Sequence, residues 1–413
     1  MSSSDNPNRF RWLHFSDIHV GVKGQEHLWP RSGHLLDADL EKVLRRAGEI
    51  DLIIFSGDLV QKGAAEEFDQ FDEIMARIMD RVSEFQDRPQ MIALPGNHDL
   101  VRPDSLDSHA ITLSSYWDRP DIRDRFWDKK GDDYRTFIGK AFENFSSWQK
   151  RAIDTGVHIR PQKTGILPGD AAYILDTPRG ALGVAALNST WLQLEGGDYT
   201  GRLHVDARQL LAITDSNPDN WVNSNDVSLL VTHQPPSWLH ANKPTTWEND
   251  INPAGRFDLH LYGHMHKPDT TTVAHGGGHA RRSLQAASLF GLEIYGAAIE
   301  QIQGYSLCEI EIADQTRKLT VWPRTMIEVA GGDMILARDL SQGADEDTGS
   351  FSMPYSLNRK KRHLHRTWSP TSVNLNEVYP LQRLSTLADR LNSTWKLYAP
   401  PLSSAELTKV SAN

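Results

Sequence analysis

The chain has 413 residues, of which 39% are hydrophobic and 24% are charged, and it contains 29 Gly. This composition is that of an ordinary soluble globular protein, and it excludes collagen-like, low-complexity and wholly disordered classes. The formal net charge of −10 is unfavourable for a general nucleic-acid-binding surface, because the non-specific part of that affinity comes from neutralising phosphates.

The cellular compartment is indicated by what the sequence lacks. The single cysteine, Cys308, cannot form an intramolecular disulfide and lies in an apolar alternation typical of a strand. The first ten residues lack the apolar region of a secretory signal, and no stretch approaches the roughly 18 apolar residues of a membrane span. We therefore expect a cytoplasmic protein without membrane contact.

Short apolar runs that end at turn-forming residues predict six β-strands. They are residues 11–15, 51–55, 90–94, 181–187, 227–231 and 258–262. Residues 34–48 and 65–83 carry apolar side chains at helical spacing, which predicts two amphipathic helices between the first three strands. Alternating strands and helices predict an α/β fold in which a sheet is packed between layers.

Residues 101–165 interrupt this alternation with a charged stretch rich in Trp and Phe. The stretch is too long for an ordinary loop, so we expect a mostly helical insertion or cap. Two roles remain open for it: a lid that shapes substrate access, and a structural side layer. Further along, residues 305–312 and 318–326 predict two strands of a closing antiparallel edge.

The sequence changes in character from about residue 338. An acidic, turn-prone segment is followed by the basic segment 359–366 and by a predicted helix near 376–396. We therefore assign residues 1–337 to the main domain and residues 338–413 to a C-terminal appendage that wraps the body or meets a partner. The basic segment is suited to nucleic acid, to an anionic partner or to the acidic body itself, although such runs are usually solvated.

Polar side chains suited to metal binding follow five of the apolar runs, at the point where each run ends. They are Asp17, His19, Asp58, Asn97, His233, His264 and His266. In an open α/β sheet, groups just past the carboxyl ends of strands converge on one edge, where ligands bind. Oxygen and imidazole ligands without a thiolate suit manganese, iron or zinc, not a structural zinc knot. Seven ligands are too many for one ion, and two ions bridged by one carboxylate use them economically.

Glycines precede three of these ligands, at Gly57, Gly96 and Gly263. A residue without a Cβ atom allows tight turns and a close approach of the backbone at a crowded site.

The ordered series of motifs resembles the calcineurin-like metallophosphoesterase superfamily over residues 11 to about 330. The motifs of this series are Asp17-x-His19, Gly57-Asp58, Gly96-Asn97-His98-Asp99, His233 and Gly263-His264-x-His266.

The resemblance implies a two-sheet α/β sandwich flanked by helices, here with a helical insertion and a C-terminal appendage. It implies two divalent metal ions, most simply manganese, with iron or zinc as alternatives. The implied ligands of the first metal are Asp17, His19, Asp58 and His266. Asp58 also bridges to the second metal, whose other implied ligands are Asn97, His233 and His264.

The resemblance also implies catalytic roles for two neighbouring residues. His98 would stabilise the developing charge or protonate the leaving alkoxide, and Asp99 would hold the other ring nitrogen of His98. A hydroxide that bridges the two metals would be the in-line nucleophile. The expected activity is therefore metal-dependent hydrolysis of phosphodiester bonds.

Two further residues are candidates for contact with the substrate phosphate. Arg102 follows the Asn97 motif closely, and its alternative is an ordinary surface arginine. Asn188 follows an apolar strand, where a strand-end turn residue is an equal alternative. His275 and His279 flank three glycines, and such a turn offers little preorganisation for a metal.

The branch of the superfamily is less sharply indicated. Residues 57–71 and 185–213 resemble the cyclic-nucleotide phosphodiesterase branch, whereas residues 14–21 also resemble the repair-nuclease branch. A DNA or RNA nuclease is therefore one alternative. The other, from a different class, is a metal-stabilised binding or regulatory module. A protein partner or a second copy of the chain would then meet the insertion or the appendage.

Overall fold

The structure is a computed structural model that describes residues 8–23, 25–87, 89–128, 132–241, 247–266, 268–274, 278–289, 293–295, 298–300, 303–313 and 316–357. The chain divides after Lys361 into two units, and the second unit lies outside the described residues. The basic segment 359–366, the predicted helix near 376–396 and His275 also lie outside them.

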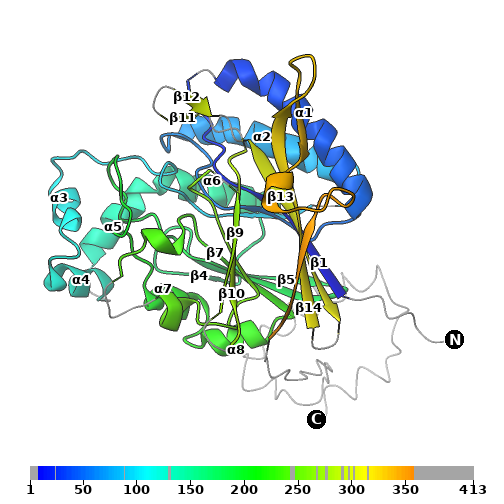
Figure 1. Cartoon of the computed structure of the whole chain (residues 1–413). Helices are drawn as coiled ribbons and strands as arrows, with labels where there is room; N and C mark the ends of the chain where they lie inside the picture. Colours follow the sequence, from blue (N-terminus) through cyan, green and yellow to red (C-terminus); the bar gives the residue numbers. More distant parts are fainter. Residues whose placement is uncertain are drawn as a thin grey trace, which may run out of the picture. The chain divides into compact units, whose positions relative to one another are not determined.

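The first sheet joins the three N-terminal predicted strands to the predicted antiparallel hairpin (Figure 1). Its strands are β1 (Asn8–Phe15), β2 (Leu52–Phe55), β3 (Met91–Ala93), β13 (Gly304–Ala313), β14 (Thr316–Glu328), β15 (Met334–Arg338) and β16 (Phe351–Ser356). Strands β1, β2 and β3 are parallel, β13 is antiparallel to β1, and β14 is antiparallel to β13. The edge is formed by β15 and β16, which pair with opposite ends of β14. The sheet therefore extends to Ser356, beyond residue 338.

The second sheet has the order β4-β5-β6-β7-β8-β10-β9. Its strands are β4 (Lys163–Thr164), β5 (Ala171–Thr177), β6 (Gly180–Ala186), β7 (Val227–Val231), β8 (Leu259–Tyr262), β9 (Asp269–Val273) and β10 (Arg281–Gln285). The central strands β6, β7, β8 and β10 are parallel to one another, whereas β5 pairs antiparallel with β6 and β9 pairs antiparallel with β10. A separate pair consists of β11 (Glu293–Tyr295) and β12 (Ala298–Glu300).

Side chains of β1 alternate between two layers, as the two-residue period of a strand requires. Phe10 and Trp12 are buried between the two sheets, whereas Leu13 and Phe15 pack under helices on the other face. Those helices are α1 (Gln25–Ala47), α2 (Ala65–Ser83) and α6 (Glu143–Asp154), and α7 (Ala207–Ile213) and α8 (Pro218–Asn223) cover the second sheet. The four layers, helix, sheet, sheet and helix, confirm the predicted sandwich.

The stretch 101–165 contains four helices, as predicted. They are α3 (Ser108–Ser114), α4 (Pro120–Trp127), α5 (Asp132–Ala141) and α6. The first three helices share a hydrophobic core with the loop after β6. In this core, Phe126 stacks on Trp191 with ring centroids 4.3 Å apart. The indole of Trp148 in α6 donates to Asp72 of α2 at 2.7 Å, so the insertion is also attached to the main helical layer. Among the described residues, no helix has the length and apolar character needed to cross a membrane.

Candidate metal centre

The loops that follow β1 and β2 are joined by main-chain hydrogen bonds. The N–H of Asp17 donates to the carbonyl of Gly57 at 3.0 Å, and the N–H of His19 donates to the carbonyl of Asp58 at 3.0 Å. Both loops lie past the carboxyl ends of adjacent parallel strands, where α/β folds place their ligands. The hydrogen bonds therefore hold three predicted metal ligands next to one another.

Most of the predicted ligands have an unusual backbone conformation. Left-handed φ angles occur at Asp17 (54°), His19 (51°), Asp58 (53°), His264 (71°) and His266 (57°). In the part of the chain that the structure describes, Asp215 and Ser216 are the other non-glycine residues with positive φ. This conformation costs about 1–2 kcal/mol for a residue other than Gly. Such strain is characteristic of functional sites, where the surrounding structure maintains it.

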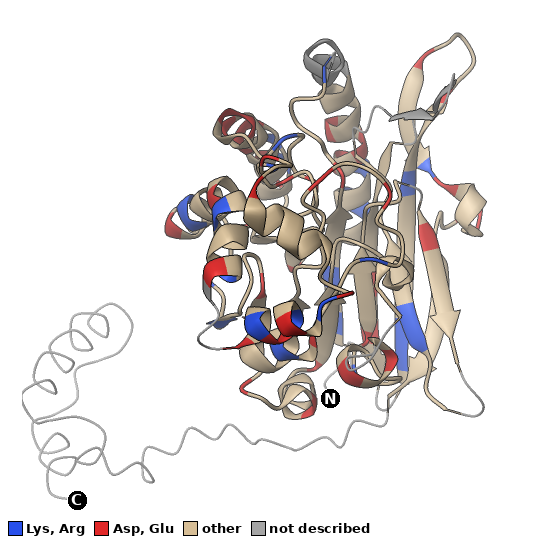
Figure 2. Ribbon diagram, turned by 90° about the vertical axis from the view of Figure 1, so that its left-hand side faces the viewer, with Lys and Arg blue, Asp and Glu red and all other residues tan. Residues whose placement is uncertain are grey.

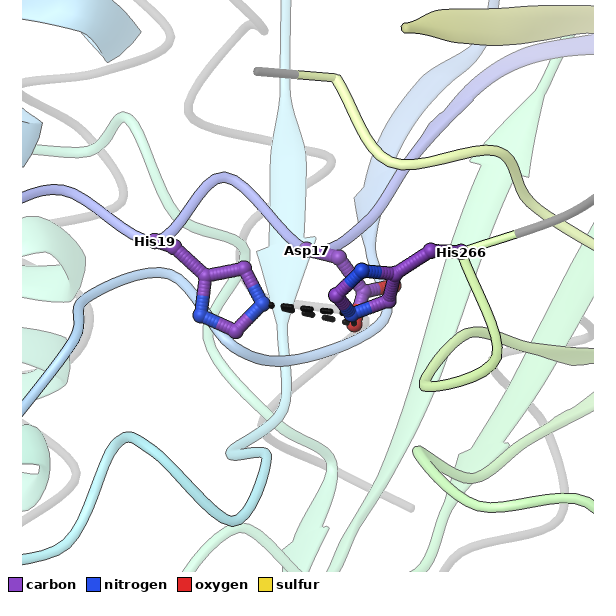
Figure 3. Close-up of side chains that lie close together, drawn as sticks. All are labelled: Asp17, His19 and His266. Carbon is purple, nitrogen blue, oxygen red and sulfur yellow. Dashed lines mark hydrogen bonds and ion pairs between the residues drawn. The ribbon is translucent and has the colours of Figure 1, made fainter. Parts of the chain in front are cut away.

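One group of ligand atoms is formed by Asp17, His19 and His266, whose side chains point toward one another (Figure 3). The Nε2 atom of His266 lies 3.2 Å from Oδ1 of Asp17 and 3.3 Å from Nε2 of His19. The Nε2 atom of His19 is also 3.8 Å from Oδ2 of Asp58. Asp17 is fully buried and His19 is 5% exposed, so the group lies away from bulk water.

A second group is formed by Asp58, His233 and His264. The Nε2 atom of His233 lies 3.1 Å from Oδ2 of Asp58, 3.2 Å from Oδ1 of Asn97 and 3.3 Å from Nδ1 of His264. Oδ2 of Asp58 thus faces ligands of both groups. The structure brings all seven predicted ligands together, with Asp58 between the two groups.

The protonation states of four of these side chains suit the binding of cations. Burial lowers the pKa of His19 to about 4 and that of His264 to about 3, so both rings are neutral at pH 7 and their nitrogens have free lone pairs. Burial favours the neutral form of Asp17 and Asp58, but the surrounding histidines outweigh it and lower the pKa of both carboxyls. Two carboxylates and several convergent imidazole lone pairs fit two divalent ions of borderline character.

In His233 and in His98, a main-chain carbonyl accepts a hydrogen bond from one ring nitrogen and so determines which nitrogen faces the site. Nδ1 of His233 donates to the carbonyl of Ser56 at 2.8 Å, which leaves Nε2 as its ligand atom. Nδ1 of His98 donates to the carbonyl of Gln61 at 2.9 Å. His98 also forms a third group with His19 and Asp58, and its main-chain N–H donates to Oδ1 of Asp58 at 2.7 Å. The Nε2 atom of His98 is therefore available to a substrate.

Glycine is required at the three positions that precede the ligands, because a side chain there would overlap neighbouring atoms. A Cβ atom on Gly96 would lie 2.1 Å from Oδ1 of Asp58, and one on Gly263 would lie 1.9 Å from Oγ of Ser16. At Gly57, where φ is 105°, the same atom would lie 2.5 Å from Nδ1 of His233. These contacts agree with the close backbone approach predicted for all three positions.

The structure differs from the prediction for Asp99. Its Oδ1 accepts a hydrogen bond from the N–H of Val60 at 2.9 Å, and its Oδ2 accepts one from the N–H of Gly96 at 2.7 Å. The ring nitrogen of His98 that Asp99 was expected to bind donates to the carbonyl of Gln61 instead. Burial and the nearby Asp58 raise the pKa of Asp99 to about 8, against these two N–H groups, which lower it. Asp99 therefore joins two loops of the site and does not orient His98.

Asn188 and Arg102 do not lie among the ligand atoms. Asn188 is fully buried, and its amide donates to the carbonyl of Pro168 and accepts the N–H of Thr190, each at 2.8 Å. It is the strand-end turn residue of the alternative interpretation. Arg102 is exposed, and its guanidinium lies beside the turn at Gly196. His279 is absent from the metal-suited groups found among the described residues.

Two residues of the site were not predicted from the sequence. Nε2 of Gln234 donates to Oδ1 of Asn97 at 3.3 Å, which orients the amide oxygen of this ligand. The ring of Trp238 lies edge-on to His264, with centroids 4.0 Å apart. Both follow His233 closely, but Gln and Trp at these positions carry no metal-ligand signal of their own.

His233 is expected to release a proton when metal binds. Burial disfavours its charged form, but Asp58 and Asp17 outweigh burial and raise its pKa to about 9. Metal-free protein therefore carries a proton on His233 at pH 7, which a metal must displace. We expect release of about one proton per chain at pH 7 to 8, and a metal affinity that rises up to about tenfold per pH unit until about pH 9.

Isothermal titration calorimetry with manganese, in buffers that differ in ionisation enthalpy, measures this release. His233→Asn is the control, since its side chain has no proton to lose and should show a smaller dependence on buffer. Heats of binding that are identical in all buffers for the native chain would contradict the assignment.

A family model and several solved structures match this chain. A model of the family described as calcineurin-like phosphoesterase matches residues 10–268. Purple acid phosphatase PPD1 from yellow lupin (Lupinus luteus) is 12% identical, with 87% of this chain and 56% of that chain covered and a TM-score of 0.41. The chain thus spans little more than half the length of the lupin enzyme.

Two Vps29 structures are also similar to this chain. A single mutant from Entamoeba histolytica is 11% identical, with 79% of this chain and 98% of that chain covered and a TM-score of 0.28. The Vps29 of Chaetomium thermophilum is 10% identical, with 84% of this chain and 95% of that chain covered and a TM-score of 0.29. No curated protein matches the sequence.

Proposed function

Because the chain belongs to the calcineurin-like phosphoesterase family, we propose that it hydrolyses phosphodiester bonds at two divalent cations held on either side of Asp58. The observation that carries the proposal is the position of Asp58, whose carboxylate faces ligand nitrogens of both groups. When bound, a pair of such cations supplies an activated water and offsets charge on the attacking and leaving oxygens. The seven ligands would hold the pair, with manganese as the first metal to test.

His98 is the residue proposed to act on the leaving oxygen. Its Nδ1 donates to the carbonyl of Gln61, which holds the ring with Nε2 on the opposite side. A proton on Nε2 is then directed toward the space beside Asp58 and His19. The ring provides a hydrogen bond or a proton to the oxygen that departs.

The charges near the centre favour a diester over a monoester. In the described part of the chain, the ion pairs of Asp17 and Asp58 are all with histidines, and no Lys or Arg is held at these carboxylates. A phosphomonoester carries about two negative charges at pH 7, and arginines commonly bind such a group in bidentate geometry. A diester carries a single charge, which the metals offset.

A cleft of about 520 Å³ beside the centre offers room for an ester substituent. The turns that carry His233 and His264 contribute Pro235 and Met265 to its lining, and Trp247 and Tyr262 supply aromatic surface. Polar side chains such as Asn252, Ser283 and Gln285 line the rest, so the cleft offers aromatic surface together with hydrogen-bonding groups to an organic substituent. The cleft supports a small phosphodiester as the substrate.

Nucleic acid is a less suitable substrate for the described surface. Lys and Arg segments are interspersed with Asp and Glu segments on the helices (Figure 2). Arginines of the insertion are paired with acids, as in the Arg119–Asp121 and Arg125–Asp133 pairs at 2.6 and 2.8 Å. Paired charges neutralise few phosphates, so these described pairs contribute little to binding a nucleic-acid strand.

The test is a comparison of three substrates with manganese-loaded protein and with metal-depleted protein as the blank. We expect metal-dependent hydrolysis of bis-p-nitrophenyl phosphate, at least about tenfold slower hydrolysis of p-nitrophenyl phosphate, and no cleavage of end-labelled single-stranded DNA. Cleavage of DNA would favour the nuclease alternative. A protein that hydrolyses none of the three, yet holds two metals, would favour a binding or regulatory module.

A further inference from the structure

A second cleft, of about 360 Å³, lies where α1 ends over the first sheet. Its lining comes from α1, β1, β13, β14, β15 and the turn before β16. Six of its side chains are cationic, namely Arg9, Arg11, Lys42, Arg46, Arg324 and Arg338. The whole chain has a net charge of −10, so this concentration of positive charge runs against its average.

The cleft is separate from the metal centre. Arg11 lies in the middle of β1, whereas Asp17 follows the end of that strand. An extended strand rises about 3.3 Å per residue, so the six steps from Arg11 to Asp17 span roughly 20 Å. A molecule in the cleft therefore does not reach the predicted ligands.

Like charges face each other twice in the lining. Arg324 of β14 is directly opposite Arg338 of β15 in the strand register. Lys42 and Arg46 are four residues apart on α1, so they lie on the same face of the helix. Like charges in either arrangement destabilise a protein, unless a counter-charge lies between them.

Carboxylates neutralise only part of the lining. Arg9 pairs with Glu311 at 3.0 Å and Arg11 with Glu309 at 2.6 Å, and Nε of Arg324 donates to Asp39 at 2.8 Å. These three pairs leave Lys42, Arg46 and Arg338 to be considered.

The remaining three cations form no direct ion pair with a carboxylate within the described ranges, although Glu41 lies near Lys42 and Asp345 near Arg338. Lys42 and Arg46 are exposed, and the guanidinium of Arg338 donates to the main-chain carbonyl of Glu346. The described lining therefore has more cationic groups than directly paired carboxylates, which suits a small anion.

The floor of the cleft is apolar. It consists of Val43, Ala47, Leu307 and Trp322. Leu307 and Trp322 are cross-strand neighbours, and Trp322 is partly buried against the helical core. An indole beside guanidinium groups is a surface on which a planar ring stacks.

We propose that this cleft binds a small anion of the nucleoside diphosphate class. The diphosphate lies between Lys42, Arg46 and Arg338, and the base stacks on Trp322. Binding of such an anion reduces the repulsion between Lys42 and Arg46 and gives Arg338 a counter-charge. The inference is independent of the phosphodiesterase activity, because it uses none of the residues of the metal centre.

The test is calorimetric titration of the full chain with ADP, which serves as the probe. In the double variant Lys42→Ala/Arg46→Ala we expect about a 100-fold weaker affinity, because two charge-assisted contacts are lost. Arg45→Ala is the matched control, since Arg45 lies on the same helix but pairs with Glu41 at 2.7 Å and does not line the cleft. Its affinity should stay within about twofold of the native chain.

Trp322→Leu tests the position of the ring. It should weaken the binding of ADP by about tenfold and leave the affinity for pyrophosphate unchanged, since only ADP has a base to stack on the indole. Pyrophosphate that binds as tightly as ADP to the native chain would overturn the assignment of the ring.

Three other results would overturn the proposal as a whole. They are adenosine binding as tightly as ADP, no binding of ADP by the native chain at millimolar concentration, and an affinity unchanged in the double variant. Loss of ADP binding in Asp58→Asn would place the nucleotide at the metal centre and would also overturn the proposal. Hydrolysis of bis-p-nitrophenyl phosphate by the double variant, without ADP, should match that of the native chain.

Discussion

Replacing Asp58 by Asn is expected to lower kcat for bis-p-nitrophenyl phosphate by about 10³-fold or more. One carboxylate oxygen of Asp58 accepts the N–H of His98, and the other faces His19 and His233. An amide has a single oxygen, so the variant loses either the contact with His98 or the bridge between the two groups of ligands. Its NH2 group would then face an N–H donor or a cation, and both arrangements are repulsive.

The measurement pairs steady-state kinetics with the metal content of each variant. We expect two metals per native chain and at most one in Asp58→Asn. Asp219→Asn is the matched control, since Asp219 is exposed and pairs with Arg256 on the surface. It should retain native activity and metal content. Undiminished hydrolysis by Asp58→Asn would exclude a bridging role for this residue.

Replacing His98 by Ala is expected to lower kcat by about 10²–10⁴-fold for a diester with an alkoxide leaving group. The main-chain N–H of residue 98 still donates to Asp58 in this variant, so both metals should remain bound. The loss should be no more than about tenfold for bis-p-nitrophenyl phosphate, because p-nitrophenolate departs without a proton. A thymidine dinucleotide serves as the alkoxide substrate.

The two substrates separate the two roles considered for His98. A proton donor gives a large loss with the dinucleotide and a small one with the nitrophenyl ester. Equal losses with both substrates would show that His98 stabilises developing charge and does not transfer a proton. Loss of bound metal in the variant would instead make His98 a ligand, contrary to its assignment here.

The convergence of the candidate metal ligands was predictable because their chemistry lies in side chains at recognisable positions. Asp17, Asp58, Asn97 and His233 each follow an apolar run, and the fold brings the ends of those runs together. The space needed at Gly96 follows from the same crowding. Sequence reasoning was adequate wherever residue type and strand position together determine the role.

Partners that belong to the main chain were not predictable. The carbonyls of Ser56 and Gln61 fix the tautomers of His233 and His98, but every residue has a carbonyl and the sequence does not mark these two. The family resemblance implies that Asp99 holds a ring nitrogen of His98. Adjacent side chains leave the backbone in different directions, and two loop N–H groups bind the carboxylate of Asp99 instead.

Two boundaries of the fold were also difficult to read. Helix α1 begins at Gln25, although apolar periodicity is visible only from Leu35, because Pro30 and Gly33 are poor helix formers in the intervening turns. Strand β16 follows an acidic turn whose composition resembles that of a linker, yet it pairs with residues Thr316 to Val321 of β14. Pairing between distant segments depends on tertiary contacts that local patterns do not reveal.

The left-handed backbone of the five ligands links the heat resistance of this protein to its metals. The conformational cost at these residues is present in the empty site as well as in the filled one, and in total it is several kcal/mol, a large part of the stability of a typical domain. The surrounding loops maintain this conformation, and bound cations would stabilise the folded state further. Exchanging these residues for ones that favour right-handed conformations is expected to raise the thermal stability and to remove the proposed activity, which is a trade-off between stability and function.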